Sequence, residues 1–325
     1  MRRRLELVGI LVMFAAQASI GQAQTAVDPP GEVIEELTVI GRYPGPPLWK
    51  VTHGEHVLWI FGNLTPLPKR MTWGSQTVEA VIARSEEVIA EPSLRVREWN
   101  PIKLIKLLRQ AKRMSKNADD ATLATVLPND LYARYSALKE RYAPRDRDMD
   151  ELRPGLVAGM LYRRAIDDAG LAMNRQVVDG INKIARRHDV EVTQSRIDAK
   201  PLDLLADLAE VSSAAEIACF DTMMKSIETD LDAMRARANA WAIGEMEALR
   251  RFDYPPAEAD CWSALESAEG LLALKRQADA EWLASAERAL GSHATTFAVL
   301  PMREILEADG LLGQLASRGY AVREP

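Results

Sequence analysis

Hydrophobic and polar residues follow two different periods along this chain, and the change of period predicts where strands give way to helices. Two β-rich runs, at residues 48–52 and 56–61, flank a turn that contains Gly54 and predict a hairpin. The spacing becomes helical over residues 75–84, and a short apolar run at residues 88–90 predicts a buried strand. The opening part of the chain is therefore expected to be mixed α/β.

The middle of the chain, from about residue 101 to residue 290, has an almost continuous helical period. Two apolar stripes mark the expected core faces of these helices. The first stripe contains Leu131, Tyr135, Leu138 and Tyr142, and the second contains Met223, Ile227, Leu231, Met234 and Trp241. Ser213 and Glu216 have the spacing of a capping box for the helix that carries Cys219. Residues 190–193 are expected to form a strand that connects this region to a sheet.

The end of the chain returns to a strand pattern at residues 295–300 and 320–322, with a helix predicted over residues 309–318 and ended by Gly319. Strands at both ends with helices between them indicate a single α/β (α+β) domain. In this domain the N- and C-terminal strands share one sheet, and the large helical middle packs on it. We expect it to span residues 48–325.

The N-terminus has the three parts of a secretory signal. Arg2 to Arg4 form a basic start, residues 7–18 are apolar, and Ala23 is a small residue suited to cleavage. A membrane anchor is the poorer alternative, because the apolar run is about a dozen residues long and roughly 20 are needed to span a bilayer. We therefore expect a signal peptide at residues 1–23, a flexible leader at residues 24–47, and a periplasmic or secreted mature protein.

Export changes what the two cysteines are expected to do. In an oxidising compartment an even number of cysteines usually pairs, whereas reduced thiols are the usual state in the cytosol. Cys219 and Cys261 are therefore predicted to form a disulfide that ties two helical segments together. No histidine lies near either cysteine in the sequence, so a catalytic thiol is not expected.

Composition and charge exclude several classes of function. The chain of 325 residues is 47% hydrophobic and 27% charged, with a net charge of -6, which is typical of a folded globular protein. The acidic balance argues against a nucleic-acid partner, because such a partner requires a basic surface. The sequence has no glycine-rich nucleotide loop and no Gly-x-Ser-x-Gly elbow.

One stretch of the chain is nevertheless strongly basic. Cations recur on a predicted helix whose other positions are mostly apolar, at Lys103, Lys106, Arg109, Lys112, Arg113 and Lys116. Two interpretations stay open at this point. The stretch is either an ordinary solvated helix face or a surface that docks onto a membrane or a partner, which suits its amphipathic pattern.

Segments at both ends of the chain are similar to segments of TraB/GumN proteins. At the start they are Leu48–Val51, Val57–Gly62 and Ala83–Glu91, and at the end they are Phe297–Val299, Asp309–Leu312 and Arg318–Val322. The resemblance implies a fold of the erythromycin-esterase and ChaN-like group, with a site at the strand ends and Glu91 as an acidic residue of that site. It also implies chemistry like that of the Tiki proteins, metal-dependent peptidases in which two histidines and acidic residues hold a divalent metal.

The sequence departs from this family pattern at the metal-ligating positions. Thr65 stands at the histidine position of the first Gly-x-x-His motif, and Glu304 stands at that of the second, which also lacks its glycine. Arg196 falls at a further acidic position, and Ala278-Asp279 stand where the family has Arg-Asn. A threonine hydroxyl is a poor ligand at neutral pH, and an arginine repels a cation. Glu91 and Asp309 remain of the expected acidic set.

Two hypotheses of function follow from these departures. In the first, the metallohydrolase site is degenerate, the chain needs no cofactor, and it has a binding or scaffold role in the cell envelope with a protein or small-molecule partner. In the second, Glu91 and Glu304 are catalytic and metal-ligating residues of a divergent hydrolase or peptidase that holds a hard divalent metal through oxygen ligands. The other candidate binding residues are Gly62, Asn63, Thr65, Arg196 and Asp309. We expect that the chain is not an active metallopeptidase.

Overall fold

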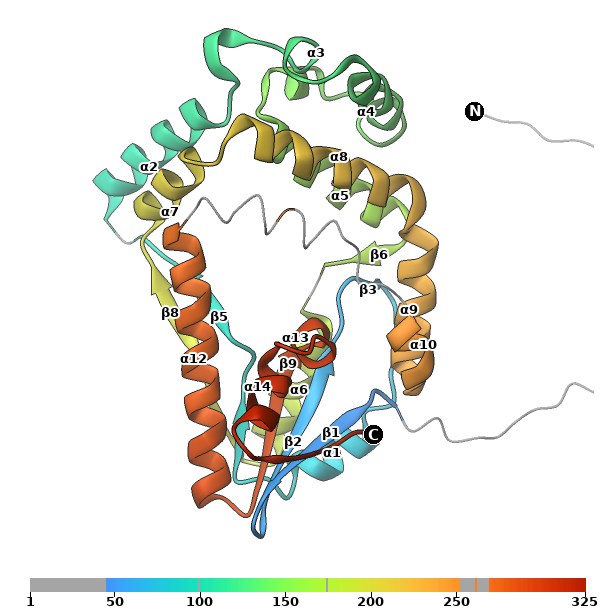
Figure 1. Cartoon of the computed structure of the whole chain (residues 1–325), viewed down its shortest axis with the longest axis vertical. Coiled ribbons are helices and arrows are strands. Elements are labelled where there is room, and N and C mark those ends of the chain that lie inside the picture. The colour runs from blue at the N-terminus through green and yellow to red at the C-terminus, as the bar shows by residue number, and fades with distance from the viewer. Residues whose placement is uncertain (1–44, 99, 174, 252–260, 262–268) are drawn as a thin grey trace, which may run out of the picture. The chain divides into compact units, whose positions relative to one another are not determined.

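The computed structural model describes residues 45–98, 100–173, 175–251, 261 and 269–325 (Figure 1). The predicted signal peptide and almost all of the predicted leader lie outside these described residues. In the described part of the chain, no helix combines the length and the apolar character that crossing a membrane requires. The strands and helices below belong to one compact unit, Arg42–Pro325, in agreement with the predicted single domain.

A six-stranded mixed sheet is built from both ends of the chain, in the order β10-β1-β2-β9-β4-β7. Its strands are β1 (Leu48–His53), β2 (His56–Asn63), β4 (Glu87–Ile89), β7 (Glu191–Thr193), β9 (Thr295–Pro301) and β10 (Ala321–Arg323). β1 pairs antiparallel with β2, through the predicted hairpin, and with β10. β2, β9, β4 and β7 are parallel. The prediction that the N- and C-terminal strands share one sheet is confirmed.

The parallel strands fix where the chain emerges from the sheet. β2 pairs with β9 from Val57↔Thr295 to Asn63↔Pro301, and β4 flanks the other side of β9. The central residues of β9 are all buried, as expected for a parallel strand covered on both faces. Because the carboxyl ends of parallel strands meet at one edge of a sheet, the residues after β2, β9 and β4 lie near one another.

Helices from several parts of the chain pack on the sheet. They are α1 (Gln76–Ile82), α6 (Gln176–Arg187), α12 (Glu269–Ser292), α13 (Met302–Leu306) and α14 (Leu311–Ser317). Figure 1 shows the long helix α12 running beside the sheet, and it contacts β1, β2, β4 and β9. Large aromatic side chains fill this core, with Trp49, Phe61, Trp241, Trp282 and Phe297 at most 1% exposed. The sheet is thereby held against α12 by an apolar interior.

The middle of the chain forms a second helical region. Its α-helices, within the described residues, are α2 (Pro101–Met114), α3 (Leu123–Val126), α4 (Asn129–Tyr142), α5 (Pro154–Asp168), α7 (Pro201–Ala209), α8 (Ser213–Thr229), α9 (Leu231–Ile243) and α10 (Met246–Arg251). Leu131 and Tyr135 of α4 are buried against Phe220 and Met224 of α8, which confirms the first predicted stripe. The second predicted stripe divides between α8 and α9, because α8 ends at Thr229.

Two details of the helical middle differ from the sequence predictions. The middle also contributes strands to two small two-stranded sheets: β3 (Leu67–Pro68) pairs with β6 (Leu171–Ala172), and β5 (Ser93–Val96) pairs with β8 (Arg196–Ala199). These strands are too short to show a period of two.

The predicted capping box is wrong, because Ser212 is the N-cap and its Oγ accepts a hydrogen bond from the Ala215 N–H at 3.2 Å. Glu216 instead forms an ion pair with Arg153 at 2.7 Å.

Cys219 and Cys261 form a disulfide, with their Cα atoms 4.6 Å apart, which confirms the predicted pairing. We expect replacement of both cysteines by serine to lower the free energy of unfolding by about 3 to 4 kcal/mol, because the bond closes a loop with a sequence separation of 42. Denaturant unfolding with and without a reducing agent measures this loss. The reductant should destabilise the natural chain and leave the double-serine variant unchanged; an equal response would contradict the prediction.

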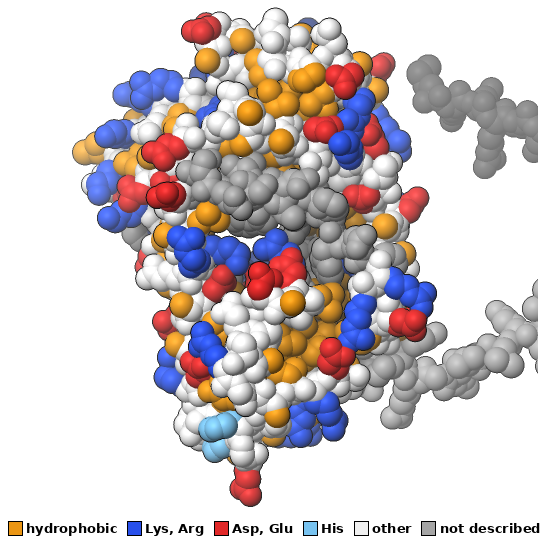
Figure 2. Space-filling view, in the orientation of Figure 1, with side chains coloured by type: hydrophobic (Ala, Val, Ile, Leu, Met, Phe, Trp, Pro, Cys, Tyr) orange, Lys and Arg blue, Asp and Glu red, His pale blue; other side chains and the backbone are white. Residues whose placement is uncertain are grey.

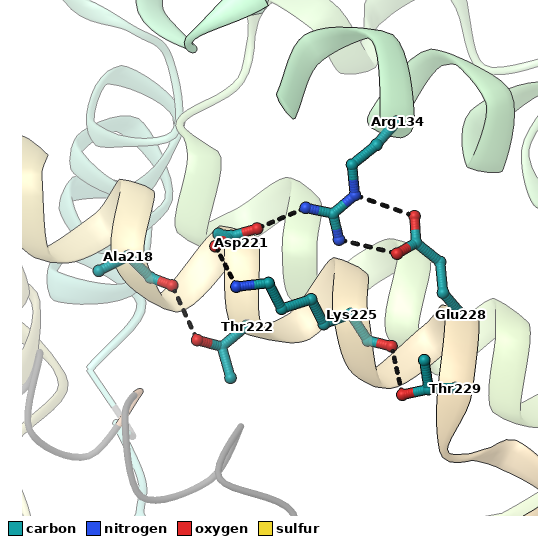
Figure 3. A network of polar contacts seen from close by, with 7 residues as sticks. All are labelled: Arg134, Ala218, Asp221, Thr222, Lys225, Glu228 and Thr229. Atoms are coloured by element: carbon teal, nitrogen blue, oxygen red, sulfur yellow. Dashed lines mark hydrogen bonds and ion pairs between the residues drawn. The ribbon is translucent and has the colours of Figure 1, made fainter. Parts of the chain in front are cut away.

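A charged network joins α4 to α8 (Figure 3). The guanidinium of Arg134 donates to Asp221 at 2.6 Å and to both carboxylate oxygens of Glu228 at 3.1 and 2.8 Å, while Lys225 donates to Asp221 at 2.8 Å. The hydrogen bonds to Glu228 raise the pKa of Arg134. Burial alone would raise the pKa of Asp221, but the hydrogen bonds from Lys225 and Arg134 outweigh it and lower that pKa.

We expect Arg134→Ala to lower the free energy of unfolding by about 1 to 2 kcal/mol, because it removes a bidentate contact with Glu228 and one of the donors to the half-buried Asp221. Since the folded pKa of Asp221 lies below its ordinary 3.8, this loss should be constant near neutral pH and shrink as the pH falls through the lowered value. Denaturant unfolding at several pH values measures both effects. Arg134→Lys should be intermediate. A loss independent of acid pH would contradict the assignment to this network.

Candidate functional site

The carboxyl edge of the sheet brings together two of the predicted site residues. Asn63 is the last residue of β2, and Glu91 follows β4 by two residues. The Asn63 side-chain amide donates to Oε2 of Glu91 at 3.0 Å, and both side chains are half-buried. The carboxylate of Glu91 is thus oriented by an amide of the neighbouring strand.

A second cluster lies where β9 runs directly into α13. Glu304 of α13 is only 8% exposed, and its Oε1 accepts from the ammonium of Lys275 on α12 at 3.2 Å. The same ammonium donates to Oδ2 of Asp279, one turn further along α12, at 2.7 Å. The guanidinium of Arg303 lies 3.8 Å from Glu304. Lys275 therefore stands between two carboxylates that come from different helices.

Burial and charge act in opposite directions in this cluster. Burial alone would lower the pKa of Lys275, but the hydrogen bond to Asp279 and the charge of Glu304 raise it above its ordinary value. Burial raises the pKa of Asp279, and the charge of Glu304 adds to the rise against the opposing effect of Lys275. The ammonium of Lys275 is consequently held in its charged form at neutral pH.

Two glycines allow α13 to approach the strand edge. A Cβ on Gly62 would lie 2.6 Å from Cε of Met302 and 3.2 Å from Cδ1 of Ile305. The carbonyl oxygen of Gly62 accepts from the indole N–H of Trp241 at 2.7 Å. A Cβ on Gly310 would lie 2.4 Å from the carbonyl oxygen of Glu304. Gly62, predicted as a binding residue, therefore serves packing, and Gly310 fixes the backbone that carries Glu304.

The remaining predicted residues are less closely connected to these clusters. Thr65 is exposed and lines a small cavity of about 60 Å³ together with Asn63 and the buried Arg237. Arg196 lies on β8, where its guanidinium donates to Gln194 at 2.6 Å. Asp309 is exposed, and its carbonyl oxygen accepts from the Gln314 side chain. Among the described residues, Arg196 and Asp309 form no hydrogen bond with Glu91 or Glu304.

A larger cavity of about 1080 Å³ opens beside the Lys275 cluster. One part of its lining is charged and includes Lys275, Asp279, Arg303 and Glu304. Another part is largely apolar and includes Leu94, Tyr162, Ile166, Leu171, Met223 and Leu271. Figure 2 shows cationic and anionic side chains side by side around an opening in the region where Figure 1 places α13. The cavity thus combines paired charges with apolar surface.

Comparison with known proteins identifies the family. A model of the TraB/PrgY/gumN family matches residues 47–324, nearly the whole chain. The chain belongs to the TraB/PrgY/gumN family. Neither a curated protein nor a solved structure matches it. The match runs from β1 to β10, so it includes the helical middle as well as the end segments that carried the sequence resemblance.

The residues present do not fit the divalent metal that the TraB/PrgY/gumN resemblance implied. One oxygen of Glu91 is bonded to the amide of Asn63, and Glu304 and Asp279 share the ammonium of Lys275. In the part of the chain that the structure describes, no group of three or more His, Cys, Asp and Glu side chains is arranged to hold a metal ion. The carboxylates are instead satisfied by donors of the protein itself.

Sequence reasoning missed the residue at the centre of this cluster. Asp279 was recognised as a departure from the family pattern, but Lys275 was not a candidate. The i,i+4 spacing of Lys275 and Asp279 on a predicted helix indicates an ion pair. That spacing alone gives no sign that Glu304 joins the pair, because Glu304 comes from a different helix.

We expect Gly310→Ala to destabilise the fold by about 1 to 3 kcal/mol, since the new Cβ would press on the backbone of Glu304. The matched control is Gly159→Ala in the middle of α5, where an added Cβ would have no neighbour within 4 Å. That control should be neutral or slightly stabilising, because alanine is the better helix former. Denaturant midpoints measure both variants, and equal midpoints would contradict the close approach of Gly310 to Glu304.

Proposed function

We propose that this member of the TraB/PrgY/gumN family is exported to the cell envelope and that its metallohydrolase-type site is degenerate and serves binding or a scaffold role. The observation that carries the proposal is the position of Lys275 between Asp279 and Glu304, at 2.7 and 3.2 Å. The ammonium supplies the positive charge that a divalent metal would otherwise supply to these carboxylates.

Electrostatics support this interpretation. A divalent cation that approached Glu304 would meet the like charges of Lys275 and Arg303, the second of which lies 3.8 Å from the carboxylate. Repulsion between like charges a few ångströms apart is strong where water is largely excluded, and Glu304 is buried. A cation could bind there only after Lys275 had moved away and lost both of its hydrogen bonds. The geometry therefore favours the function without a metal.

The cavity beside Lys275 supports retention of a binding role. Its volume of about 1080 Å³ suits a small molecule or a peptide side chain. Its apolar lining would hold the body of such a ligand, and the charged groups around Lys275 would bind a polar end. The disulfide between Cys219 and Cys261 supports export, because such bonds persist in oxidising compartments.

The alternative is a divergent hydrolase that uses oxygen ligands around Glu91 and Glu304. Its support is that Asn63, another of the candidate binding residues, lies beside Glu91, 3.0 Å from its carboxylate. The two functions differ in what a divalent cation does to the natural chain. The degenerate site would be indifferent to the cation, and the hydrolase would be stabilised by it.

We expect Mg²⁺, Mn²⁺, Ca²⁺ and Zn²⁺ to leave the melting temperature of the natural chain unchanged.

Lys275→Met should lower the free energy of unfolding by about 1 to 3 kcal/mol, because Asp279 and Glu304 would then repel each other. Without the ammonium of Lys275, the pKa of Asp279, already raised in the natural chain, should rise further in the variant. The loss of stability should therefore be largest at neutral pH, where Asp279 is charged, and should become smaller as the pH falls and Asp279 is protonated. Divalent cations should restore part of the loss. Thermal melts across pH and cation concentration measure each effect.

Lys225→Met is the matched control. Lys225 also bonds an aspartate at i,i+4, but Arg134 remains to neutralise Asp221. This control should show no recovery with divalent cations. Stabilisation of the natural chain by a divalent cation, abolished by Glu304→Gln or Glu91→Gln, would contradict the degenerate site and establish the hydrolase alternative.

A further inference from the structure

Helix α2 has an outer face that the rest of the described structure leaves uncovered. None of its residues is buried, and among the described helices it packs mainly on α7. Leu107, Ala111 and Met114 are half-buried, whereas large apolar side chains elsewhere on the helix are exposed. Ile102, Ile105 and Leu108 are 77%, 52% and 61% exposed, respectively. Exposed large apolar side chains so close together are typical of a binding surface.

The charge of this helix is of one sign. It carries five cations and no acidic residue, and a sixth cation, Lys116, follows it and is bonded to Glu151. The other five form no ion pair with any residue that the structure describes: they are Lys103, Lys106, Arg109, Lys112 and Arg113. The cations of the α4–α8 network and of the α12–α13 cluster are, by contrast, paired. The whole chain has a net charge of -6, so the positive charge of α2 is opposite in sign to that of the chain as a whole.

From the interleaving of exposed apolar side chains with these unpaired cations, we infer that α2 docks onto an anionic phospholipid surface. Ile102, Ile105 and Leu108 would enter the boundary between headgroups and acyl chains. The long stems of Lys106 and Arg109 would lie along the same boundary while their charged ends reach lipid phosphates. Figure 2 shows blue cationic and orange apolar side chains together at the edge of the molecule where Figure 1 places α2.

An anionic membrane fits this face better than a nucleic acid or a second copy of the chain. Nucleic-acid phosphates would pair with the cations but would leave the exposed isoleucines and leucine in water. A second copy of α2 would place cations against cations, which repel. A lipid surface satisfies both the cations and the apolar side chains at once.

Vesicle co-sedimentation of the chain from Gln24 onward, which contains the whole folded unit, tests this inference. The chain should bind vesicles of phosphatidylglycerol with phosphatidylcholine, should not bind vesicles of phosphatidylcholine alone, and should dissociate as salt is added. Lys106→Glu/Arg109→Glu should weaken vesicle binding by more than roughly tenfold, since each basic residue at such a surface contributes roughly fivefold to the affinity. Ile105→Ser/Leu108→Ser should weaken binding as well, because it removes the inserting groups.

The control is Lys183→Glu/Arg186→Glu on α6, which reverses two exposed cations at the same i,i+3 spacing on a helix whose apolar face is buried. It should bind vesicles as the natural chain does. Equal binding to both kinds of vesicle, or equal loss in the α6 control, would overturn the inference. A dimer in solution that Ile105→Ser/Leu108→Ser dissociates, without vesicle binding by the natural chain, would assign the face to a second copy instead.

Discussion

The parallel pairing of β2 with β9 is the constraint on which the rest of the structure depends. It joins the two ends of the chain in one register, from Val57↔Thr295 to Asn63↔Pro301, and closing so long a loop costs conformational entropy. Burial of apolar side chains on both strands, with Phe61 and Phe297 fully buried, offsets this cost. Since α13 begins directly after β9, the register that places Asn63 also places Glu304.

Once that edge is formed, its carboxylates require partners, and the fold supplies them from elements remote in sequence. Asn63 donates to Glu91 across the sheet edge, and Lys275 reaches Glu304 and Asp279 from α12. A buried carboxylate is costly without such a partner, whether the partner is a metal or a protein donor. At this edge of the sheet the carboxylates of Glu91, Glu304 and Asp279 are therefore all bound by donors of the protein itself.

The sequence predicted those features that arise from local pattern. The hairpin at Gly54, the strands at both ends and the helical middle follow from hydrophobic period, and all are present. β5 and β8 were missed because each is short and pairs across about a hundred residues. Family motifs identified Glu91 and Glu304, but Lys275 joins them only through tertiary packing. Arg196 and Asp309, placed by the same motifs, lie on exposed segments and form no hydrogen bond with either glutamate among the described residues.

The basic helix and the Lys275 cluster are connected through one element. α7 contacts α2 on one side and α12 on the other, and α12 carries both Lys275 and Asp279. A surface that holds α2 would therefore also restrain α7 and, through it, the helix that forms one wall of the cavity. The cavity and the proposed docking face are thus joined through directly packed helices, so attachment at α2 would set the orientation of the cavity relative to the membrane.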